Sequence, residues 1–88
     1  MSTGDPNQRE ITVYTAPYCV LCEMVKEYLQ RHGVEFAEVN VSQDSISRQR
    51  MVAGSGQEGV PVVEINGVMI VGFDKEKLAD ILGFRTDD

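Results

Sequence analysis

The sequence is poor in cysteine and has no long apolar run: its 88 residues include only Cys19 and Cys22 as cysteines. A small secreted domain held together by disulfides needs about four to eight cysteines spread along the chain, so that class is excluded. The longest apolar stretch, near residues 60–65, is interrupted by Pro61 and Glu64. A membrane-spanning helix needs about 20 apolar residues, and a secretion signal begins with basic and then apolar residues, so neither is predicted. We therefore expect a cytoplasmic protein.

Basic residues are scarce as well. The chain has 8 lysines and arginines against 14 acidic residues, a formal net charge of −6 and a pI of about 4.6. Phosphate groups repel such a surface, so neither nucleic acid nor an anionic membrane is expected as a partner. The hydrophobic content of 42% and the length fit one globular domain. We assign this domain to residues 10–84, with a mobile N-terminal tail at 1–9 and a short C-terminal tail at 85–88.

The first half of the chain has the pattern of a strand, a helix and a second strand. Apolar β-branched residues predict strands at about residues 10–15 and 35–41. Between them the apolar spacing becomes helical from Cys19 onward, and Gly33 is expected to end this helix. Its buried face is predicted to contain Leu21, Val25, Tyr28, Leu29 and His32.

Two further helices are predicted in the second half. The first is polar, with Ser42 or Ser45 as its expected N-cap and Gly54-Ser55-Gly56 at its end. The second begins after Asp74 as N-cap and ends at Gly83. Its buried side should contain Leu78, Ile81 and Leu82.

Between these helices, two β-branched runs at about residues 60–65 and 68–71 flank Asn66-Gly67. Asn-Gly between such runs is the strongest short-range signal for an antiparallel hairpin. The element order is therefore β-α-β-α-β-β-α. Because a right-handed crossover makes the first two strands parallel, we expect an α/β domain with a four-stranded mixed sheet and helices on both faces.

Cys19 and Cys22 form a C-x-x-C at the junction between the first strand and its helix. This position is typical of a dithiol redox site, because unpaired N–H groups and the helix dipole favour a thiolate at Cys19. The thiolate is the species that attacks a disulfide. Cys22 is close enough along the helix to attack the mixed disulfide that forms on Cys19. We therefore expect Cys19 as the nucleophile and Cys22 as the resolving cysteine.

Two simpler interpretations compete with a redox site. A zinc site needs four ligands, and His32, ten residues along the helix from Cys22, is the only other soft candidate, so we expect no metal. The cysteines could also be small buried hydrophobic residues without a chemical role, but their junction position argues against this.

Two neighbouring segments supply further candidates. Tyr18 precedes Cys19 and either lines a substrate groove or covers the edge of the sheet. Pro61 lies in the most hydrophobic predicted strand, where a trans proline would interrupt the hydrogen-bond ladder. A cis Val60–Pro61 bond at the start of the strand removes this conflict and leaves the Val60 backbone exposed for an extended partner. The alternative is an ordinary edge-strand proline.

Three motifs in this order resemble those of the glutaredoxin-like redoxins of the thioredoxin superfamily. They are Val13-Tyr14-Thr15 before Cys19-x-x-Cys22, then Gly59-Val60-Pro61, and finally Val71-Gly72-Phe73-Asp74 before the last helix. The resemblance covers about residues 11–83. It implies a thioredoxin-like fold, thiol–disulfide oxidoreduction and a cis Pro61 facing Cys19. It also implies partner binding along Val60 and the turn at Gly72, Phe73 and Asp74.

The sequence differs from typical glutathione-using glutaredoxins around the cysteines and in the segment after the hairpin. Cys-Pro-Tyr-Cys is replaced by Cys19-Val20-Leu21-Cys22, and the usual lysine three residues before the first cysteine is replaced by Ala16. The usual Gly-Gly and Asp-Asp pairs are replaced by Gly72-Phe73 and Asp74-Lys75. The Gly-Phe pair and the apolar residues between the cysteines resemble instead the redoxins that serve ribonucleotide reductase and are reduced by thioredoxin reductase.

We therefore predict a dithiol–disulfide oxidoreductase, a monomeric electron carrier that reduces disulfide-bearing protein substrates without a bound cofactor. Its electrons would come from glutathione, another low-molecular-weight thiol or a flavin reductase. The alternative within this class is a ribonucleotide-reductase-specific redoxin reduced by thioredoxin reductase. The rival from another class is a binding module that carries an iron–sulfur cluster, although such proteins usually lack the second cysteine. Arg48 and Arg50 either hold a substrate carboxylate or belong to a solvated helix face.

Overall fold

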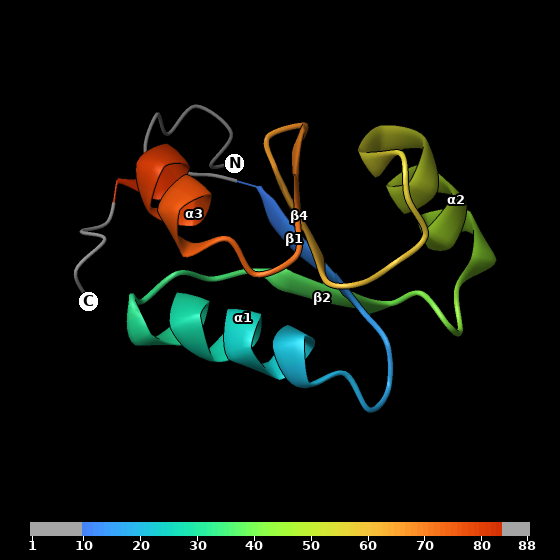
Figure 1. Ribbon diagram of the computed structural model, residues 1–88, viewed down its shortest axis with the longest axis horizontal. Coiled ribbons are helices and arrows are strands. Elements are labelled where there is room, and N and C mark those ends of the chain that lie inside the picture. The colour runs from blue at the N-terminus through green and yellow to red at the C-terminus, as the bar shows by residue number, and fades with distance from the viewer. Residues whose placement is uncertain (1–9, 84–88) are drawn as a thin grey trace, which may run out of the picture.

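The computed structural model describes residues 10–83, which form a four-stranded sheet with three helices (Figure 1). The elements are β1 (Ile11–Thr15), α1 (Val20–Arg31), β2 (Ala37–Asn40), α2 (Ser45–Ser55), β3 (Val62–Ile65), β4 (Val68–Val71) and α3 (Lys75–Leu82). Their order is the predicted one. The predicted tails at residues 1–9 and 85–88, and residue 84 at the end of the predicted domain, lie outside the described residues.

The strands form one four-stranded mixed sheet, as predicted, and their order in it is β2-β1-β3-β4. β1 and β2 are parallel, whereas β3 is antiparallel to both β1 and β4. The parallel pair follows from the crossover through α1. The β3–β4 hairpin follows from the turn at Asn66 and Gly67, whose φ angles of 49° and 92° are both positive.

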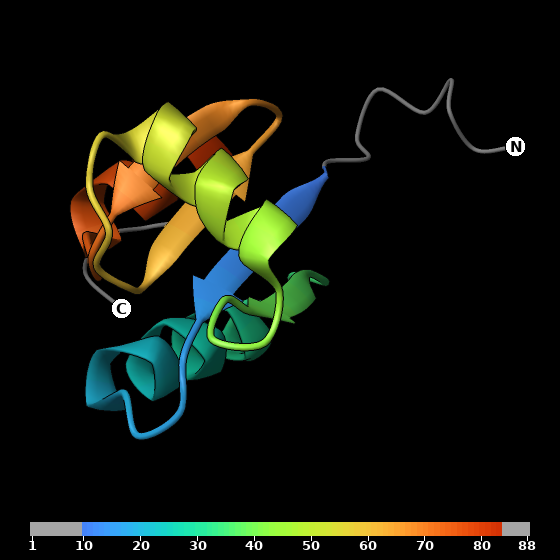
Figure 2. The same ribbon diagram turned by 90° about the vertical axis from the view of Figure 1, so that its right-hand side faces the viewer.

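Helices cover both faces of the sheet (Figures 1 and 2). The larger core cluster lies between the sheet and the helices α1 and α3, and it contains Ile11, Val13, Val25, Tyr28, Leu29, Val63, Ile65, Ile70, Leu78 and Leu82. The smaller cluster, on the face covered by α2, contains Tyr14, Val41, Met51 and Val62. The division arises because successive side chains of a strand point to opposite faces. The cysteine-bearing helix and α2 therefore lie on opposite sides of the sheet.

The structure corrects the predicted helix faces at two positions. Leu21 is 47% exposed and Ile81 is 38% exposed, although both were predicted to be buried. In α1 the buried stripe contains Cys22, Val25, Tyr28 and Leu29, and in α3 it contains Leu78, Ala79 and Leu82. The buried stripe of α1 thus includes Cys22 in place of Leu21, and that of α3 includes Ala79 in place of Ile81.

The predicted N-cap of α2 is also wrong. Asp44, and neither Ser42 nor Ser45, is the N-cap, and its carboxylate accepts the backbone N–H of Ser47 at 3.1 Å. Asp44 has the extended backbone that an N-cap needs, and an ionised carboxylate accepts a stronger hydrogen bond than a hydroxyl. These hydrogen bonds from Ser47 lower the pKa of the Asp44 carboxyl.

Two strands are shorter than predicted. β2 covers residues 37–40 instead of 35–41, and β3 begins at Val62 instead of residue 60. Pro61 has no N–H to donate to the ladder, which explains the later start of β3. The Val60–Pro61 peptide bond is cis, as predicted.

Helix α2 is fastened to the sheet mainly by one apolar side chain and one ionic network. Met51 is its only buried residue. Glu64 of β3, 8% exposed, accepts the Tyr14 hydroxyl at 2.6 Å and is gripped by Nε and Nη2 of Arg50 at 3.2 and 2.7 Å. The Arg50 guanidinium lowers the pKa of the Glu64 carboxyl, and burial raises the pKa of Tyr14. Arg50 therefore binds a carboxylate of this chain. The sequence predicted that it either holds a substrate carboxylate or lies on a solvated helix face.

Candidate active site

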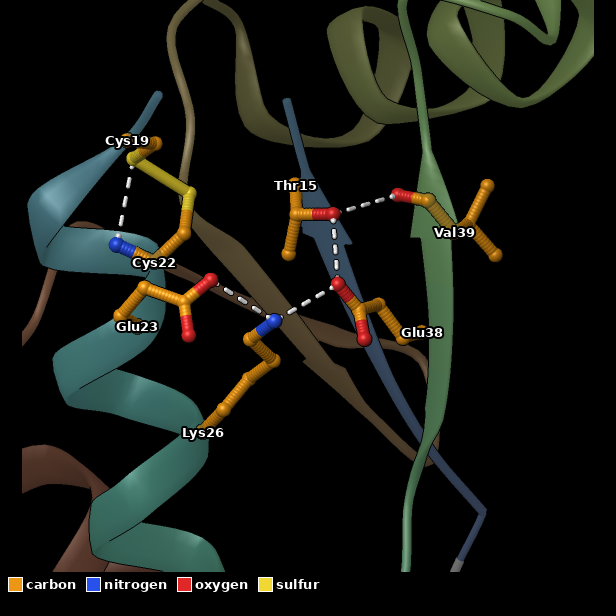
Figure 3. Close-up of polar contacts among 7 residues, drawn as sticks. All are labelled: Thr15, Cys19, Cys22, Glu23, Lys26, Glu38 and Val39. Atoms are coloured by element: carbon orange, nitrogen blue, oxygen red, sulfur yellow. Dashed lines mark hydrogen bonds and ion pairs between the residues drawn. A yellow bond between two sulfur atoms is a disulfide. The ribbon is translucent and has the colours of Figure 1, made fainter. Parts of the chain in front are cut away.

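Cys19 and Cys22 form a disulfide at the N-terminus of α1 (Figure 3). Cys19 is the N-cap, with an extended backbone (φ −108°, ψ 107°), and its Sγ accepts the backbone N–H of Cys22 at 3.1 Å. Cys22 lies in the first helical turn and is 1% exposed, whereas Cys19 is partly exposed. An incoming thiol or disulfide thus finds the Cys19 sulfur the more accessible of the two.

The loop from β1 to α1 turns sharply before the disulfide. Tyr18 has a φ of 60°, in the left-handed region that non-glycine residues rarely occupy, and its side chain is fully exposed. It covers no part of the sheet, so the edge-covering prediction for Tyr18 is wrong. Such backbone conformations cluster at functional sites, and Tyr18 stands in solvent next to Cys19.

The helical turn that carries the cysteines also exposes apolar side chains. Val20 is 72% exposed, Leu21 47% and Met24 44%. Single exposed apolar residues need no explanation, but these three lie within one turn and a half of Cys19. They form an apolar surface that runs beside the accessible sulfur.

The register of the sheet brings Pro61 and Gly72 to the end of β1 that leads to Cys19. Tyr14 pairs with Val62, and Val62 pairs with Val71. The residue just before Val62 and the residue just after Val71 are therefore neighbours at this end of the sheet. The backbone N–H of Gly72 donates to the Pro61 carbonyl at 2.8 Å. Within residues 10–83, neither backbone group of Val60 has a hydrogen-bond partner. The loop before β3 and the start of α1 lie at the same end of the molecule in both views (Figures 1 and 2).

Phe73 and Asp74, two further predicted binding residues, make structural contacts. Phe73 is partly buried and packs edge-on against the Tyr28 ring, with 5.6 Å between centroids. Asp74 is the N-cap of α3, as predicted, and its carboxylate accepts the Lys77 N–H at 3.1 Å. These contacts fix the turn after β4 against α1 and start the last helix.

We expect Asp74→Ala to lower the free energy of unfolding by about 0.5–2 kcal/mol, because the first turn of α3 loses its side-chain acceptor. Asp74→Asn should cost much less, since Asn is as good an N-cap as Asp. Urea denaturation of the two variants measures this difference. If Asp74→Ala lost activity but kept its stability, the side chain would act on the substrate and not as a cap.

An ionic cluster that the sequence did not reveal begins directly after Cys22 (Figure 3). Lys26 Nζ lies 3.0 Å from Glu23 and 2.9 Å from Glu38 of β2, and Thr15 Oγ1 donates to Glu38 at 3.2 Å. The hydrogen bonds to Glu38 and then Glu23 raise the pKa of Lys26. Because residues i and i+4 share a helix face, Lys26 lies next to the buried Cys22. The Glu23–Lys26 spacing was visible in the sequence, but the contact with Glu38 was not.

A pocket of about 510 Å³ adjoins the loop that precedes Cys19. Its walls come from Ala16 in that loop, from Ser45 and Arg48 at the start of α2, and from Glu58 and Val60 in the loop before β3. Arg48 Nη2 lies 3.0 Å from Glu58 Oε1, and the two side chains are 50% and 73% exposed. Arg48 was a candidate for holding a substrate carboxylate, whereas no role was predicted for Glu58.

Neither a metal site nor a membrane span is present in the described part of the chain. In residues 10–83, no three or more His, Cys, Asp and Glu side chains are grouped closely enough to hold a metal ion. His32 packs edge-on against Tyr28, with 4.8 Å between ring centroids. None of the described helices has the length and apolar character that crossing a membrane requires.

The chain matches the glutaredoxin family over residues 11–70. It is 40% identical over 72 residues to an uncharacterized glutaredoxin-like 8.6 kDa protein of Clostridium pasteurianum, a match that covers 82% of this chain and 96% of that protein. It is 30% identical over 73 residues to glutaredoxin 3 of Escherichia coli, covering 83% and 88% of the two chains.

The chain also superposes on solved structures of thioredoxin-like and glutaredoxin-like proteins. The thioredoxin-like protein BC3987 superposes with a TM-score of 0.78 at 37% identity, covering 83% of this chain and 100% of that one. The glutaredoxin-like protein NrdH-redoxin from Escherichia coli superposes with a TM-score of 0.74 at 26% identity, covering 82% and 93%. The family match includes the strand, helix and cis-proline segment around the disulfide, and not only remote parts of the fold. The chain therefore belongs to the glutaredoxin family of the thioredoxin superfamily, and it is a dithiol thiol–disulfide oxidoreductase.

Proposed function

We propose that Cys19 is the attacking sulfur of an electron carrier that reduces disulfides in other proteins, and that Cys22 resolves the intermediate. The difference in access between the two sulfurs carries this assignment: Cys19 is partly exposed at the helix N-cap, and Cys22 is 1% exposed. The helix N-terminus also favours a thiolate at Cys19. We place this activity in the cytoplasm, where thiols are kept reduced.

The exchange proceeds in two steps from the reduced protein. The Cys19 thiolate attacks one sulfur of the substrate disulfide, so that the substrate S–S bond breaks, a mixed disulfide forms and the other substrate sulfur leaves as a thiolate. Cys22, deprotonated, then attacks the Cys19 sulfur and expels the second substrate thiolate. The substrate gains two electrons, its thiolates take up protons, and the protein is left with the Cys19–Cys22 disulfide seen in the structure.

Disulfide-bearing proteins are the substrates that the surface around Cys19 favours. The exposed apolar side chains of Val20, Leu21 and Met24 suit a protein surface better than a small polar thiol. The unpaired backbone of Val60, next to the cis Pro61, can pair with an extended segment of a partner. We assign Tyr18 and the turn at Gly72, Phe73 and Asp74 to the border of the same binding surface.

The electron source is either a low-molecular-weight thiol such as glutathione or a flavin reductase. Two features favour the reductase. The residues between the cysteines are apolar, and Ala16 is neutral and lines a pocket whose arginine is already paired. The similarity to NrdH-redoxin, a glutaredoxin-like protein with a thioredoxin-like activity profile, supports the same choice. The Gly72-Phe73 pair keeps ribonucleotide reductase as a second candidate substrate.

A coupled assay with two reducing systems tests this proposal. NADPH oxidation is followed with a disulfide protein substrate, once with thioredoxin reductase and once with glutathione and glutathione reductase. We expect faster turnover with thioredoxin reductase. Equal or faster turnover with glutathione would overturn the proposed electron source, and no turnover in either system or with chemically reduced protein would overturn the proposed function.

A further inference from the structure

The pocket that adjoins the loop before Cys19 contains one basic side chain among the described residues that line it, and that side chain is already paired. Arg48 projects from α2, and Glu58, from the loop before β3, meets it at 3.0 Å. The other nearby carboxylate, Asp44, is engaged by the backbone N–H and the hydroxyl of Ser47 at 3.1 and 2.9 Å. Glu58 is therefore the carboxylate that neutralises Arg48.

The place of this pair matters for any small thiol that reacts at Cys19. Ala16, three residues before Cys19, and Val60, next to the cis Pro61, line the same pocket as Arg48. A small thiol joined to the Cys19 sulfur must lie on the adjoining surface. If it carries a carboxylate, Arg48 is the cation to which that group is drawn, but Glu58 must first be displaced.

We infer that Glu58 is a specificity-determining residue that selects against carboxylate-bearing small thiols at Cys19. The inference rests on the proposed role of Cys19 as the attacking sulfur. The pocket has no net charge with Glu58 in place and a charge of +1 without it. The chain has a formal net charge of −6, so removal of this carboxylate lowers the electrostatic repulsion of an anionic ligand at the pocket.

The solvent exposure of the Arg48–Glu58 ion pair limits how strongly Glu58 can change the affinity for glutathione. Arg48 and Glu58 are 50% and 73% exposed. Pairs of this kind change affinity by about 1.4- to 5-fold, because they are worth about 0.2–1 kcal/mol and each 1.4 kcal/mol is tenfold. We expect Glu58→Gln to lower the glutathione KM by this factor. The gain should shrink as salt rises, since exposed charges are screened over about 8–10 Å at ordinary ionic strength.

The experiment compares a charged and an uncharged thiol on the same disulfide. Reduction of the Cys19–Cys22 bond is measured against concentration for glutathione and for 2-mercaptoethanol, in wild type and in Glu58→Gln. We expect the variant to improve only the glutathione reaction. Ala16→Lys, which adds one positive charge to the same pocket, should give a similar gain, and the double variant should combine both.

Two controls separate local from general charge effects. Glu35→Gln removes the same charge just before β2, at the opposite end of the sheet, and should leave both thiols unaffected. In an Arg48→Gln background the gain from Glu58→Gln should become smaller, because the cation that it releases is gone. An unchanged glutathione KM in Glu58→Gln, with normal reduction by 2-mercaptoethanol, would overturn the inference and leave the proposed function intact. If neither of these thiols nor thioredoxin reductase reduced the Cys19–Cys22 disulfide of the wild type, the proposed function would be contradicted instead.

Discussion

Replacement of Cys19 by serine should abolish disulfide exchange, whereas Cys22→Ser should stop the protein at a mixed disulfide. A serine hydroxyl does not ionise near neutral pH, so Cys19→Ser loses the attacking group altogether. In Cys22→Ser the first step remains, but no sulfur is left beside Cys19 to release the bound partner. Turnover should fall to the uncatalysed rate in the first variant.

Mass spectrometry after incubation with a disulfide substrate distinguishes the two variants. Cys22→Ser should carry the mass of one substrate thiol, removable by dithiothreitol, and Cys19→Ser should carry none because its remaining sulfur is buried. Both variants should stay folded, since a bridge over a sequence separation of 3 constrains the unfolded chain very little. Circular dichroism checks this. A mixed disulfide on Cys22 in the Cys19→Ser variant, formed as fast as on Cys19, would reverse the two roles.

The second large effect concerns Glu64, the carboxylate through which β3 holds α2. We expect Glu64→Ala to lower the free energy of unfolding by about 1–3 kcal/mol, because the Tyr14 hydroxyl, in a residue only 2% exposed, loses its acceptor. Glu64→Gln keeps an acceptor oxygen and should cost less. Glu27→Ala, at an exposed position in the middle of α1, is the matched control and should change little. Urea denaturation gives the comparison.

This contribution should depend on pH with a definite sign. The Arg50 guanidinium and the Tyr14 hydroxyl lower the pKa of Glu64 from its ordinary value of 4.5. A carboxyl with a lowered pKa in the folded state stabilises the protein fully above its unfolded value and loses this effect as the pH falls toward the folded one. The stability gap between wild type and Glu64→Gln should therefore be constant above about pH 6 and narrow below pH 4.5. A gap that stayed constant down to pH 3 would show that the charge of Glu64 contributes nothing.

Features that depend on residues adjacent along the chain were predictable from the sequence. Strand alternation, the Asn66-Gly67 turn and the end of α3 at Gly83 are local properties of the backbone, and they led to the observed element order. The first helix ends one residue earlier than predicted, with His32 and not Gly33 as its C-cap. The parallel pairing of β1 and β2 and the cis bond at Pro61 followed from general rules about crossovers and strand prolines. The C-x-x-C at a strand-to-helix junction likewise identified the reactive disulfide.

Helix faces and caps were predicted less well, because they depend on small differences between adjacent residues. Leu21 and Ile81 have the apolar character of a buried face, but the packing of α1 and α3 against the sheet buries Cys22 and Ala79 instead. At the start of α2, Ser42, Asp44 and Ser45 are all good N-caps. The backbone conformation at Asp44 selects among them.

The ion pairs around the site were decided by the tertiary structure alone. Lys26 meets Glu38 only because α1 packs on the face of β2 from which Glu38 points, and Arg50 meets Glu64 only because α2 packs on the opposite face of β3. Residue spacing along the chain does not encode such contacts, since they depend on strand register and on which face each helix covers. The local sequence thus determined where the two sulfurs lie on α1, whereas the packing of separate elements determined which charges surround them.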